Sequence, residues 1–330
     1  MWLPRQISYP NILPFLPYFV YLYISYTKMN AKHLLLLPSL MVSATAVFAS
    51  SPLQKAECGT IERLEVVSPQ LNDTIDVDVW LPDGFSAEKH YPVLYMHDGQ
   101  NLFDASTTWN HQSWEMDVTP CRMIEQGEIE PMIIVGIHSD PATRVSQLMP
   151  QEAVKDAGLE ELMEEVKLKG RPIMGDSYAD FVVNTLKPLI DSSYPTLSDR
   201  DHTAVMGSSM GGLMSLYLIC QYPETFGGAG CLSTHWYGSF NAGDRFGNAM
   251  MNYVENHLPD PSTHKLYFDH GTSTIDAYYG PWETKALLIA QNKGYKYGVN
   301  LDSYIDYGAP HEETAWAARV GRPLRFLFGK

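Results

Sequence analysis

The chain has 330 residues, of which 45% are hydrophobic, 12% aromatic and 18% charged, a composition that supports a sizeable core and excludes an intrinsically disordered protein. Its 38 acidic and 23 basic residues give a formal net charge of −15 at pH 7, which argues against a nucleic-acid partner. No Asp or Glu precedes Glu57. The sequence therefore predicts an acid-free, apolar leader followed by an acidic globular body.

The leader has the pattern of a secretory signal from Met29 onward. Lys32 precedes an apolar run over residues 34–48, and Val47 and Ala49 supply the small residues at the −3 and −1 positions of a cleavage site. The apolar run is short and interrupted by proline, which is unfavourable for a membrane span. We expect cleavage after Ala49.

From this pattern we predict that residues 1–28 are an extension produced by start-codon choice and that residues 29–49 are a signal peptide. A genuine N-terminal anchor is the alternative. Cleavage would leave residues 50–330 as an exported, periplasmic or extracellular protein with a formal charge of about −18, because the leader carries three basic residues and no acidic one. We expect no stable membrane span after processing, and the sequence does not indicate the oligomeric state.

Beyond residue 57 the chain alternates short apolar strands with helical patterns. Strands are predicted at residues 60–67, 74–81, 92–96, 132–137, 202–206, 228–233, 265–269 and 299–305. The first two lack an intervening helix and should pair antiparallel, whereas the clearest amphipathic helices cover 178–192 and the residues after Ser209. The pattern predicts one α/β domain over 50–330, with a mostly parallel sheet of about eight strands and helices on both faces.

Residues 138–176 are irregular and are predicted to be an insertion in this domain. They include a charged helical stretch from about Glu152 to Lys169, bounded by Pro150 and Gly170. This stretch is either a solvated surface helix or a segment that borders a site at the strand ends, and the sequence does not choose between the two.

The segment Gly207-Ser208-Ser209-Met210-Gly211 matches G-x-S-x-G, a sharp turn between a strand and a helix that exposes a nucleophilic serine. The bare motif is weak, but an apolar strand precedes it and an amphipathic helix follows it, as the motif requires. Small residues on either side let the strand and the helix approach closely. We predict that Ser209 is the nucleophile and that Ser208 points away from the apex.

A nucleophilic serine needs a general base and an orienting acid, which follow it in the chain order acid and then histidine. His311 lies after the last predicted strand and before a C-terminal helix, so it is the predicted base. Asp269, Asp276 and Glu283 all follow the preceding strand and are candidates for the acid. We favour Asp276, because its place in the loop lets it reach His311, whereas Asp269 would hold a turn.

The oxyanion formed during attack needs backbone N–H donors. Met210 follows the nucleophile, and Gln100 lies in the loop after the third strand, so both are predicted donors. Gly99 allows the tight turn that points the Gln100 N–H into the site. His235 and His270 are candidates for lining the pocket.

The four cysteines give limited information. Cys220 and Cys231 lie in apolar segments and are predicted to be buried thiols. Cys58 and Cys121 are candidates for a disulfide in an oxidising compartment, although pairing does not follow from sequence. The sequence has no CxxC, no HExxH and no His/Cys cluster at metal spacing, so we predict no metal site.

Four blocks of the sequence are similar to those of a known family. They are His97–Phe103, Gly207–Gly212, Leu232–Trp236, and Phe268–Thr272 with Ile275-Asp276. Together they resemble the esterase D group of the α/β-hydrolase superfamily, which includes enterochelin, feruloyl and acetyl-xylan esterases, over about residues 60–325. The resemblance implies an α/β-hydrolase fold and hydrolysis of carboxylic esters without a cofactor.

Carried over by position, the resemblance supports the triad and oxyanion donors Ser209, Asp276, His311, Gln100 and Met210. It also implies that a wider set contacts substrate, namely Asp98, Gly99, Arg144, His235 and Trp236. Asp98-Gly99 replaces the His-Gly of many hydrolase oxyanion loops, which leaves the first donor open. Trp109, Trp114 and Trp236 are candidates for an acyl or sugar platform, although at least one is expected in the core.

We therefore predict an exported serine esterase that forms an acyl-enzyme and acts on a small-molecule or saccharide ester. The alternatives are an acyltransferase with the same triad and a catalytically silent hydrolase-fold binding protein. A cytosolic thioester hydrolase would fit the family but conflicts with the predicted export signal. Siderophore, feruloyl and acetylated-polysaccharide esters remain equal candidates for the substrate.

Overall fold

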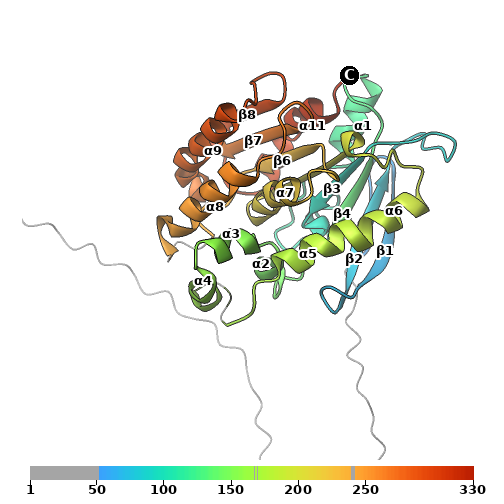
Figure 1. Ribbon diagram of the computed structural model, residues 1–330. Coiled ribbons are helices and arrows are strands. Elements are labelled where there is room, and N and C mark those ends of the chain that lie inside the picture. The colour runs from blue at the N-terminus through green and yellow to red at the C-terminus, as the bar shows by residue number, and fades with distance from the viewer. Residues whose placement is uncertain (1–51, 167, 169, 239–241) are drawn as a thin grey trace, which may run out of the picture. The chain divides into compact units, whose positions relative to one another are not determined.

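The computed structural model describes residues 52–166, 168, 170–238 and 242–330. The predicted extension and signal peptide, residues 1–49, lie outside this part of the chain. Within it, eight strands form one sheet in the order β1-β2-β4-β3-β5-β6-β7-β8 (Figure 1). The strands are β1 (Thr60–Ser68), β2 (Asp73–Leu81), β3 (Val93–His97), β4 (Ile133–Ile137), β5 (Thr203–Ser208), β6 (Gly228–Leu232), β7 (Lys265–Gly271) and β8 (Leu301–Asp306).

All the predicted strands are present, with ends that agree to within a couple of residues. β1 pairs antiparallel with β2, as predicted, and β2 pairs antiparallel with β4. The remaining neighbours are parallel. Every residue of β3, β4, β5 and β6 is buried, which explains why these strands read as continuous apolar runs. The predicted α/β-hydrolase fold is confirmed.

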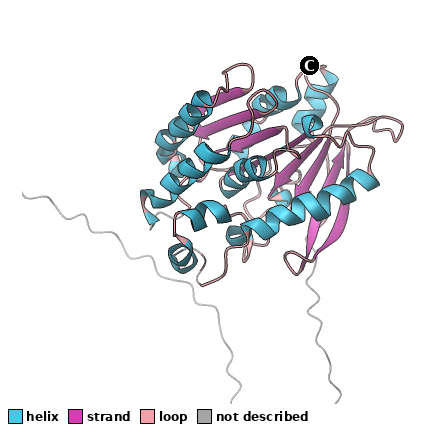
Figure 2. Ribbon diagram, in the orientation of Figure 1, coloured by secondary structure: helices cyan, strands magenta, loops and turns pink. Residues whose placement is uncertain are grey.

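Helices cover both faces of the sheet (Figure 2). In the described residues they are α1 (Val118–Glu125), α2 (Arg144–Gln147), α3 (Gln151–Asp156), α4 (Glu160–Val166), α5 (Gly175–Phe181), α6 (Lys187–Ser193), α7 (Met210–Gln221), α8 (Asp244–His257), α9 (Gly280–Asn292), α10 (Glu313–Arg319) and α11 (Gly321–Phe328). Residues of α5 to α9 contribute to one buried cluster, and residues of α1, α10 and α11 contribute to a second. The sheet therefore separates two apolar cores.

The predicted helix over 178–192 forms one run made of α5, a π-helical turn at Val182–Leu186, and α6. Its apolar face is buried, with Tyr178, Phe181 and Ile190 almost fully enclosed. The amphipathic spacing thus placed this run correctly.

The segment 138–176 contains α2, α3 and α4. The charged stretch forms two helices instead of one, because Gly158 between them adopts a φ of 62°, a conformation that ends a helix. Val154 and Met163 are fully buried, so the two helices pack on the core and are not fully solvated. Arg144, at the start of α2, lines the cleft described below.

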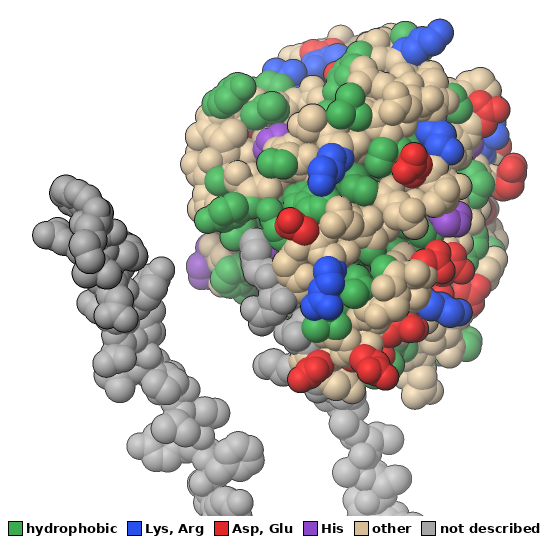
Figure 3. Space-filling model, turned by 60° about the vertical axis from the view of Figure 1, so that its left-hand side comes forward, with side chains coloured by type: hydrophobic (Ala, Val, Ile, Leu, Met, Phe, Trp, Pro, Cys, Tyr) green, Lys and Arg blue, Asp and Glu red, His purple; other side chains and the backbone are tan. Residues whose placement is uncertain are grey.

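On the exterior, acidic and basic side chains are interspersed over the face shown in Figure 3. In the part of the chain that the structure describes, no helix has the length and apolar character needed to cross a membrane.

Candidate active site

The G-x-S-x-G segment forms a strained turn at the carboxyl end of β5. Ser209 has φ 58° and ψ −120°, a region that costs a non-glycine residue about 1 to 3 kcal/mol. Glycines make the turn possible, since a Cβ on Gly207 would lie 2.9 Å from the Gly211 carbonyl carbon, and one on Gly212 would lie 2.7 Å from Thr234 Oγ1. The turn leaves Ser209 partly exposed, between a strand end and a helix start.

The structure brings His311 and Asp276 together. His311 Nδ1 lies 2.5 Å from Asp276 Oδ1, and the other oxygen, Oδ2, accepts hydrogen bonds from Ser233 Oγ at 2.5 Å and from the Gly271 N–H at 2.7 Å. Burial alone would raise the pKa of Asp276, but these contacts hold it below its ordinary value. The carboxylate is therefore charged at neutral pH and able to orient the imidazole.

The two other candidate acids have different partners. Asp269 Oδ1 lies 3.0 Å from Arg319 Nη2, and Glu283 Oε2 lies 3.0 Å from His270 Nδ1. Both carboxyl groups are buried, and burial raises the pKa of each, that of Glu283 to about 7. Of the three acids considered, Asp276 is the one that contacts His311.

Aromatic rings fix the orientation of His311. Its ring meets Trp316 edge-to-face, with centroids 5.0 Å apart, and Tyr279 with centroids 5.8 Å apart. Its backbone N–H donates to Thr274 Oγ1 at 2.9 Å. If Nδ1 donates to Asp276, as this contact favours, neutral His311 carries its acceptor at Nε2.

Ser209 and His311 line the same cleft, which has a volume of about 480 Å³. Trp109 is 83% exposed on this cleft. The other residues lining it are mainly polar or aromatic: His97, Asp98, Gln100, Asn101, Asn110, Gln112, Trp114, Ser139, Pro141, Arg144, Ser208, Glu312, Glu313 and Trp316. The cleft thus combines Ser209 and His311 with polar groups and an exposed indole.

The loop after β3 forms one wall. Asp98 has φ 57° and binds Arg144 through two contacts, of 2.6 Å to Nε and 2.7 Å to Nη2. Burial alone would raise the pKa of Asp98, but the Arg144 guanidinium holds it below its ordinary value. Because the Asp98 carboxylate is engaged in this way, the pair forms a rigid part of the wall.

The predicted oxyanion donors lie at two short turns. Gly99–Asn101 form a 3₁₀ turn, and the Asn101 N–H donates to the Asp98 carbonyl at 2.9 Å. The Gln100 side chain is held by the Ser139 N–H, which donates to its Oε1 at 3.0 Å. Met210 is the first residue of α7, where a backbone N–H has no acceptor within the helix. Both residues are thus placed next to the cleft or the serine turn.

The prediction that Trp236 contacts substrate is wrong. Its side chain is fully buried and packs near Phe268, with ring centroids 6.3 Å apart, because the chain turns into the core after β6. His235 is also buried and is not among the described residues that line the cleft. Its backbone N–H donates to the Ser209 carbonyl at 3.1 Å, so this residue stabilises the serine turn through a main-chain hydrogen bond.

Three residues that support the acid were not predicted. Ser233 Oγ, which contacts Asp276, also lies 3.0 Å from Trp316 Nε1 and 2.9 Å from Arg319 Nη2. Ser233 is fully buried with φ 40°. Its place in the Leu232–Trp236 block was the available signal, but a serine in a motif does not reveal partners more than 80 residues away.

His97 is a further buried residue at the site. Its Nδ1 lies 2.7 Å from the Tyr178 hydroxyl, and its side chain would lie 3.0 Å from a Cβ placed on Gly207. Burial lowers the pKa of His97 to about 4, so it is neutral at physiological pH. His97 therefore packs against the serine turn as an uncharged support.

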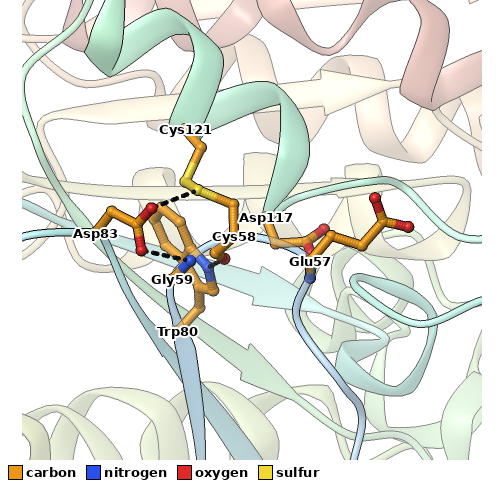
Figure 4. Close-up of a disulfide and its surroundings, with 7 residues drawn as sticks. All are labelled: Glu57, Cys58, Gly59, Trp80, Asp83, Asp117 and Cys121. Atoms are coloured by element: carbon orange, nitrogen blue, oxygen red, sulfur yellow. Dashed lines mark hydrogen bonds between the residues drawn. A yellow bond between two sulfur atoms is a disulfide. The ribbon is translucent and has the colours of Figure 1, made fainter.

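Cys58 and Cys121 form a disulfide (Figure 4). Cys220 and Cys231 are buried free thiols. Potential ligand atoms of Cys58, Asp83 and Cys121 lie within 4.8 Å of one another. Since the two sulfur atoms are bonded to each other, this group offers no thiolates to a metal ion.

Comparisons with known proteins place this geometry in context. A family model described as "Putative esterase" matches residues 68–321. The chain is 26% identical over 260 residues to the uncharacterized protein YbbA of Bacillus subtilis, covering 76% of this chain and 92% of YbbA. It is 25% identical over 276 residues to an endo-1,4-beta-xylanase/feruloyl esterase of Xylanibacter ruminicola, covering 82% of this chain and 31% of that protein.

Among solved structures, the enterochelin esterase from Shigella flexneri is similar with a TM-score of 0.61 and 16% identity. The match covers 83% of this chain and 59% of the enterochelin esterase. At this identity the likeness concerns the fold.

Proposed function

The chain belongs to the "Putative esterase" family and is an esterase, and from this premise we propose that it is a serine ester hydrolase with Ser209, His311 and Asp276 as its catalytic triad. The observation that carries the proposal is the 2.5 Å contact between His311 Nδ1 and Asp276 Oδ1, in a cleft that Ser209 also lines.

In the proposed mechanism, Ser209 Oγ attacks the ester carbonyl carbon and its proton passes to His311 Nε2. Asp276 stabilises the resulting imidazolium through Nδ1. His311 then donates the proton to the departing alkoxide, which leaves as the alcohol while the acyl group stays on Ser209. Water, deprotonated by His311, then attacks the acyl carbon. The bond from this carbon to Ser209 Oγ breaks, His311 returns the proton to Ser209 Oγ, and the acid is released.

We propose that the oxyanion accepts hydrogen bonds from the N–H groups of Gln100 and Met210. The position of Met210 at the N-terminus of α7 supports this role, because the helix dipole favours negative charge there. The position of Gln100 on the cleft wall supports the second donor.

The substrate is proposed to be an ester with a planar aromatic or saccharide part. The exposed Trp109 indole supports this choice, since an indole stacks on either group, and polar side chains such as Asn110 and Gln112 also line the cleft. The relatives include the feruloyl esterase of Xylanibacter ruminicola and a ferri-bacillibactin esterase of Bacillus subtilis, so feruloyl and siderophore esters head the panel to be tested.

We further propose that residues 50–330 form the catalytic domain of an exported protein. The Cys58–Cys121 disulfide supports export, because disulfides persist mainly in oxidising compartments. The first residue of the secreted protein, determined by mass spectrometry, tests the predicted cleavage after Ala49.

Replacement of Ser209 by alanine tests the triad. We expect Ser209→Ala to lower kcat by about 10⁴-fold or more on p-nitrophenyl and feruloyl esters, and a fluorophosphonate probe to label Ser209 in the wild-type protein. Ser208→Ala is the matched control and should change kcat by less than about 10-fold. Full activity in Ser209→Ala would contradict the assignment of Ser209 as the nucleophile. Transfer of the acyl group to added alcohols in preference to water would indicate an acyltransferase.

A further inference from the structure

Residues 52–59, which we call the N-terminal strap, are bound to the domain along their length. The contacts are Lys55 N–H to Asp104 Oδ2 (3.1 Å), Glu57 N–H to Asp117 Oδ2 (2.6 Å), Gly59 N–H to Asp83 Oδ1 (3.0 Å), Trp80 Nε1–H to the Cys58 carbonyl (2.8 Å), and the Cys58–Cys121 disulfide. Figure 4 shows Cys58 of the strap joined to Cys121 of α1, with Asp83 beside Gly59. The strap is therefore a fixed part of the described domain.

Gln54 is the buried centre of the strap, with 3% of its surface exposed. Its Nε2 donates to Asp78 Oδ2 at 2.7 Å and to the Gly99 carbonyl at 2.8 Å. Its Oε1 accepts from the N–H groups of Phe103 at 3.0 Å and Asp104 at 3.2 Å. A side-chain amide has two donor hydrogens and two acceptor lone pairs, so every hydrogen-bonding position of Gln54 is occupied.

Asp78 fixes which way the Gln54 amide points. It is fully buried and also contacts Arg63 Nε at 2.5 Å and His138 Nε2 at 2.9 Å. Burial alone would raise the pKa of Asp78, but His138, Arg63 and Gln54 hold it at about 2. A charged carboxylate only accepts hydrogen bonds, so the NH₂ end of Gln54 must face Asp78 and Gly99.

We propose that Gln54 is a positioning residue for the Gln100 oxyanion donor, an inference that rests on the proposed function. The Gly99 carbonyl that Gln54 binds and the Gln100 N–H belong to one peptide group. That group is planar and trans, and the described residues contain no cis peptide bond. The carbonyl accepts the Gln54 hydrogen bond at 2.8 Å and a longer one from the Leu102 N–H at 3.3 Å. Together they fix the direction of the carbonyl and therefore of the N–H, which points the opposite way, and the shorter of the two comes from Gln54.

Two further effects act on the same peptide. A hydrogen bond accepted by the carbonyl polarises the amide and strengthens its N–H as a donor. On the side of β4 the turn is packed so closely that a Cβ on Gly99 would lie 2.4 Å from the Gly136 carbonyl carbon. Gln54 and Gly136 thus hold the Gly99–Gln100 peptide between them, without any contact of Gln54 with the reacting atoms.

The test is Gln54→Met, which keeps the length of the side chain and removes its hydrogen bonds. We expect kcat to fall by about 10- to 100-fold, the range found for residues that orient metal ligands through hydrogen bonds, while KM changes by less than about twofold. The Ki of a trifluoromethyl ketone, whose adduct with the serine carries an oxyanion, should rise by the same factor as kcat falls. Rates are expressed per active site titrated to completion with a fluorophosphonate, so that unfolded protein does not contribute.

Asp83→Ala is the matched control, because it removes the Gly59 contact at the other end of the strap and touches no residue of the cleft wall. It should leave kcat and the ketone Ki within about twofold of wild type. An unchanged kcat per active site in Gln54→Met, a rise in KM alone, or an equal kcat loss in Asp83→Ala would each overturn the inference. The same experiment includes fluorophosphonate labelling of Ser209 and the Ser209→Ala variant. If Ser209 is labelled and Ser209→Ala is inactive, one of these contrary results would overturn the role of Gln54 alone. If Ser209 is not labelled or Ser209→Ala is active, the proposed function and the inference fail together.

Discussion

Two histidine–carboxylate pairs lie at the carboxyl end of β7, and they differ in surroundings. His311 and Asp276 are 2.5 Å apart, and His311 borders the cleft. His270 and Glu283 are 3.0 Å apart, and both are almost fully buried. Both pairs therefore have a short distance between the histidine and the carboxylate, but of the two histidines only His311 borders the cleft.

The partners of the two carboxylates also differ. Asp276 accepts hydrogen bonds from Ser233 and Gly271 in addition to its contact with His311, and its pKa is lowered. For Glu283, burial outweighs the effect of His270 and raises the pKa to about 7. The comparison teaches that proximity of a histidine and an acid does not define a triad. A proposed triad also needs hydrogen-bond donors that keep the acid charged and a serine turn that lines the same cleft as the histidine.

The largest expected effect separates the two histidines. His311→Ala should lower kcat/KM by about 10⁴- to 10⁶-fold, because the serine would lose its base. His270→Gln should lower kcat/KM by less than about 10-fold, measured as the rate per titrated active site. A comparable loss in both variants would show that the buried pair takes part in catalysis.

The second effect separates the two acids. Asp276→Asn should lower kcat by about 10²- to 10⁴-fold, because an amide cannot stabilise the imidazolium and favours the wrong tautomer of His311. Glu283→Gln is the matched control and should retain most of the activity in the same steady-state assay. Loss of activity in Glu283→Gln but not in Asp276→Asn would assign the catalytic acid to Glu283 instead of Asp276.

A third effect concerns the remaining acid. Asp269→Asn should lower the free energy of unfolding by about 3 kcal/mol, since it removes a charge from a buried pair and leaves the Arg319 guanidinium undercompensated. Chemical denaturation monitored by tryptophan fluorescence measures this change. The rate per active site should stay within about 10-fold of wild type; a fall as large as that of Asp276→Asn would assign the catalytic acid to Asp269.

The smallest effect is the opposite pH dependence of the two pairs. The pKa of Glu283 is raised from 4.5 to about 7, so its contribution to folding is present below about pH 4.5 and is lost as the pH rises through 7. The pKa of Asp276 is lowered from 3.8, so its contribution is present above about pH 4 and is lost as the pH falls.

When the pH rises from 5 to 8, the free energy of unfolding should therefore fall less in Glu283→Gln than in the wild type, and the difference should be about 1 to 3 kcal/mol. When the pH falls from 5 to 3, the free energy of unfolding should instead fall less in Asp276→Asn than in the wild type. Denaturation curves at these three pH values test both statements. Parallel pH profiles for the two variants and the wild type would contradict them.

Local patterns in the sequence account for much of the fold and for the core of the site. The central strands β3 to β6 are buried apolar runs, and the serine turn is encoded within five consecutive positions, Gly207 to Gly211. The preference for Asp276 over Asp269 and Glu283 used its depth in the loop, and the structure places Asp276 against His311. Their catalytic roles stay a prediction until the variants are assayed.

The errors arose where burial or distant contacts decide the outcome. Trp236 was expected to contact substrate because it lies in the Leu232–Trp236 block of the family resemblance. An indole suits the core equally well, and the sequence does not show which way the chain turns. Gly158 was not recognised as a helix break, since a glycine is tolerated within a helical pattern. Gln54 gave no signal, because its partner Gly99 lies 45 residues away and no local periodicity encodes that contact.

The Cys58–Cys121 disulfide has a practical consequence for preparing the protein. Material made in a reducing cytoplasm, or stored with a thiol reductant, would lack the covalent tie between the strap and α1 and would be a different chemical species from oxidised material. The two forms are distinguished by counting thiols after denaturation, since the fully reduced chain presents four and the oxidised chain presents only those of Cys220 and Cys231. Kinetic constants from two laboratories become comparable once that count accompanies them.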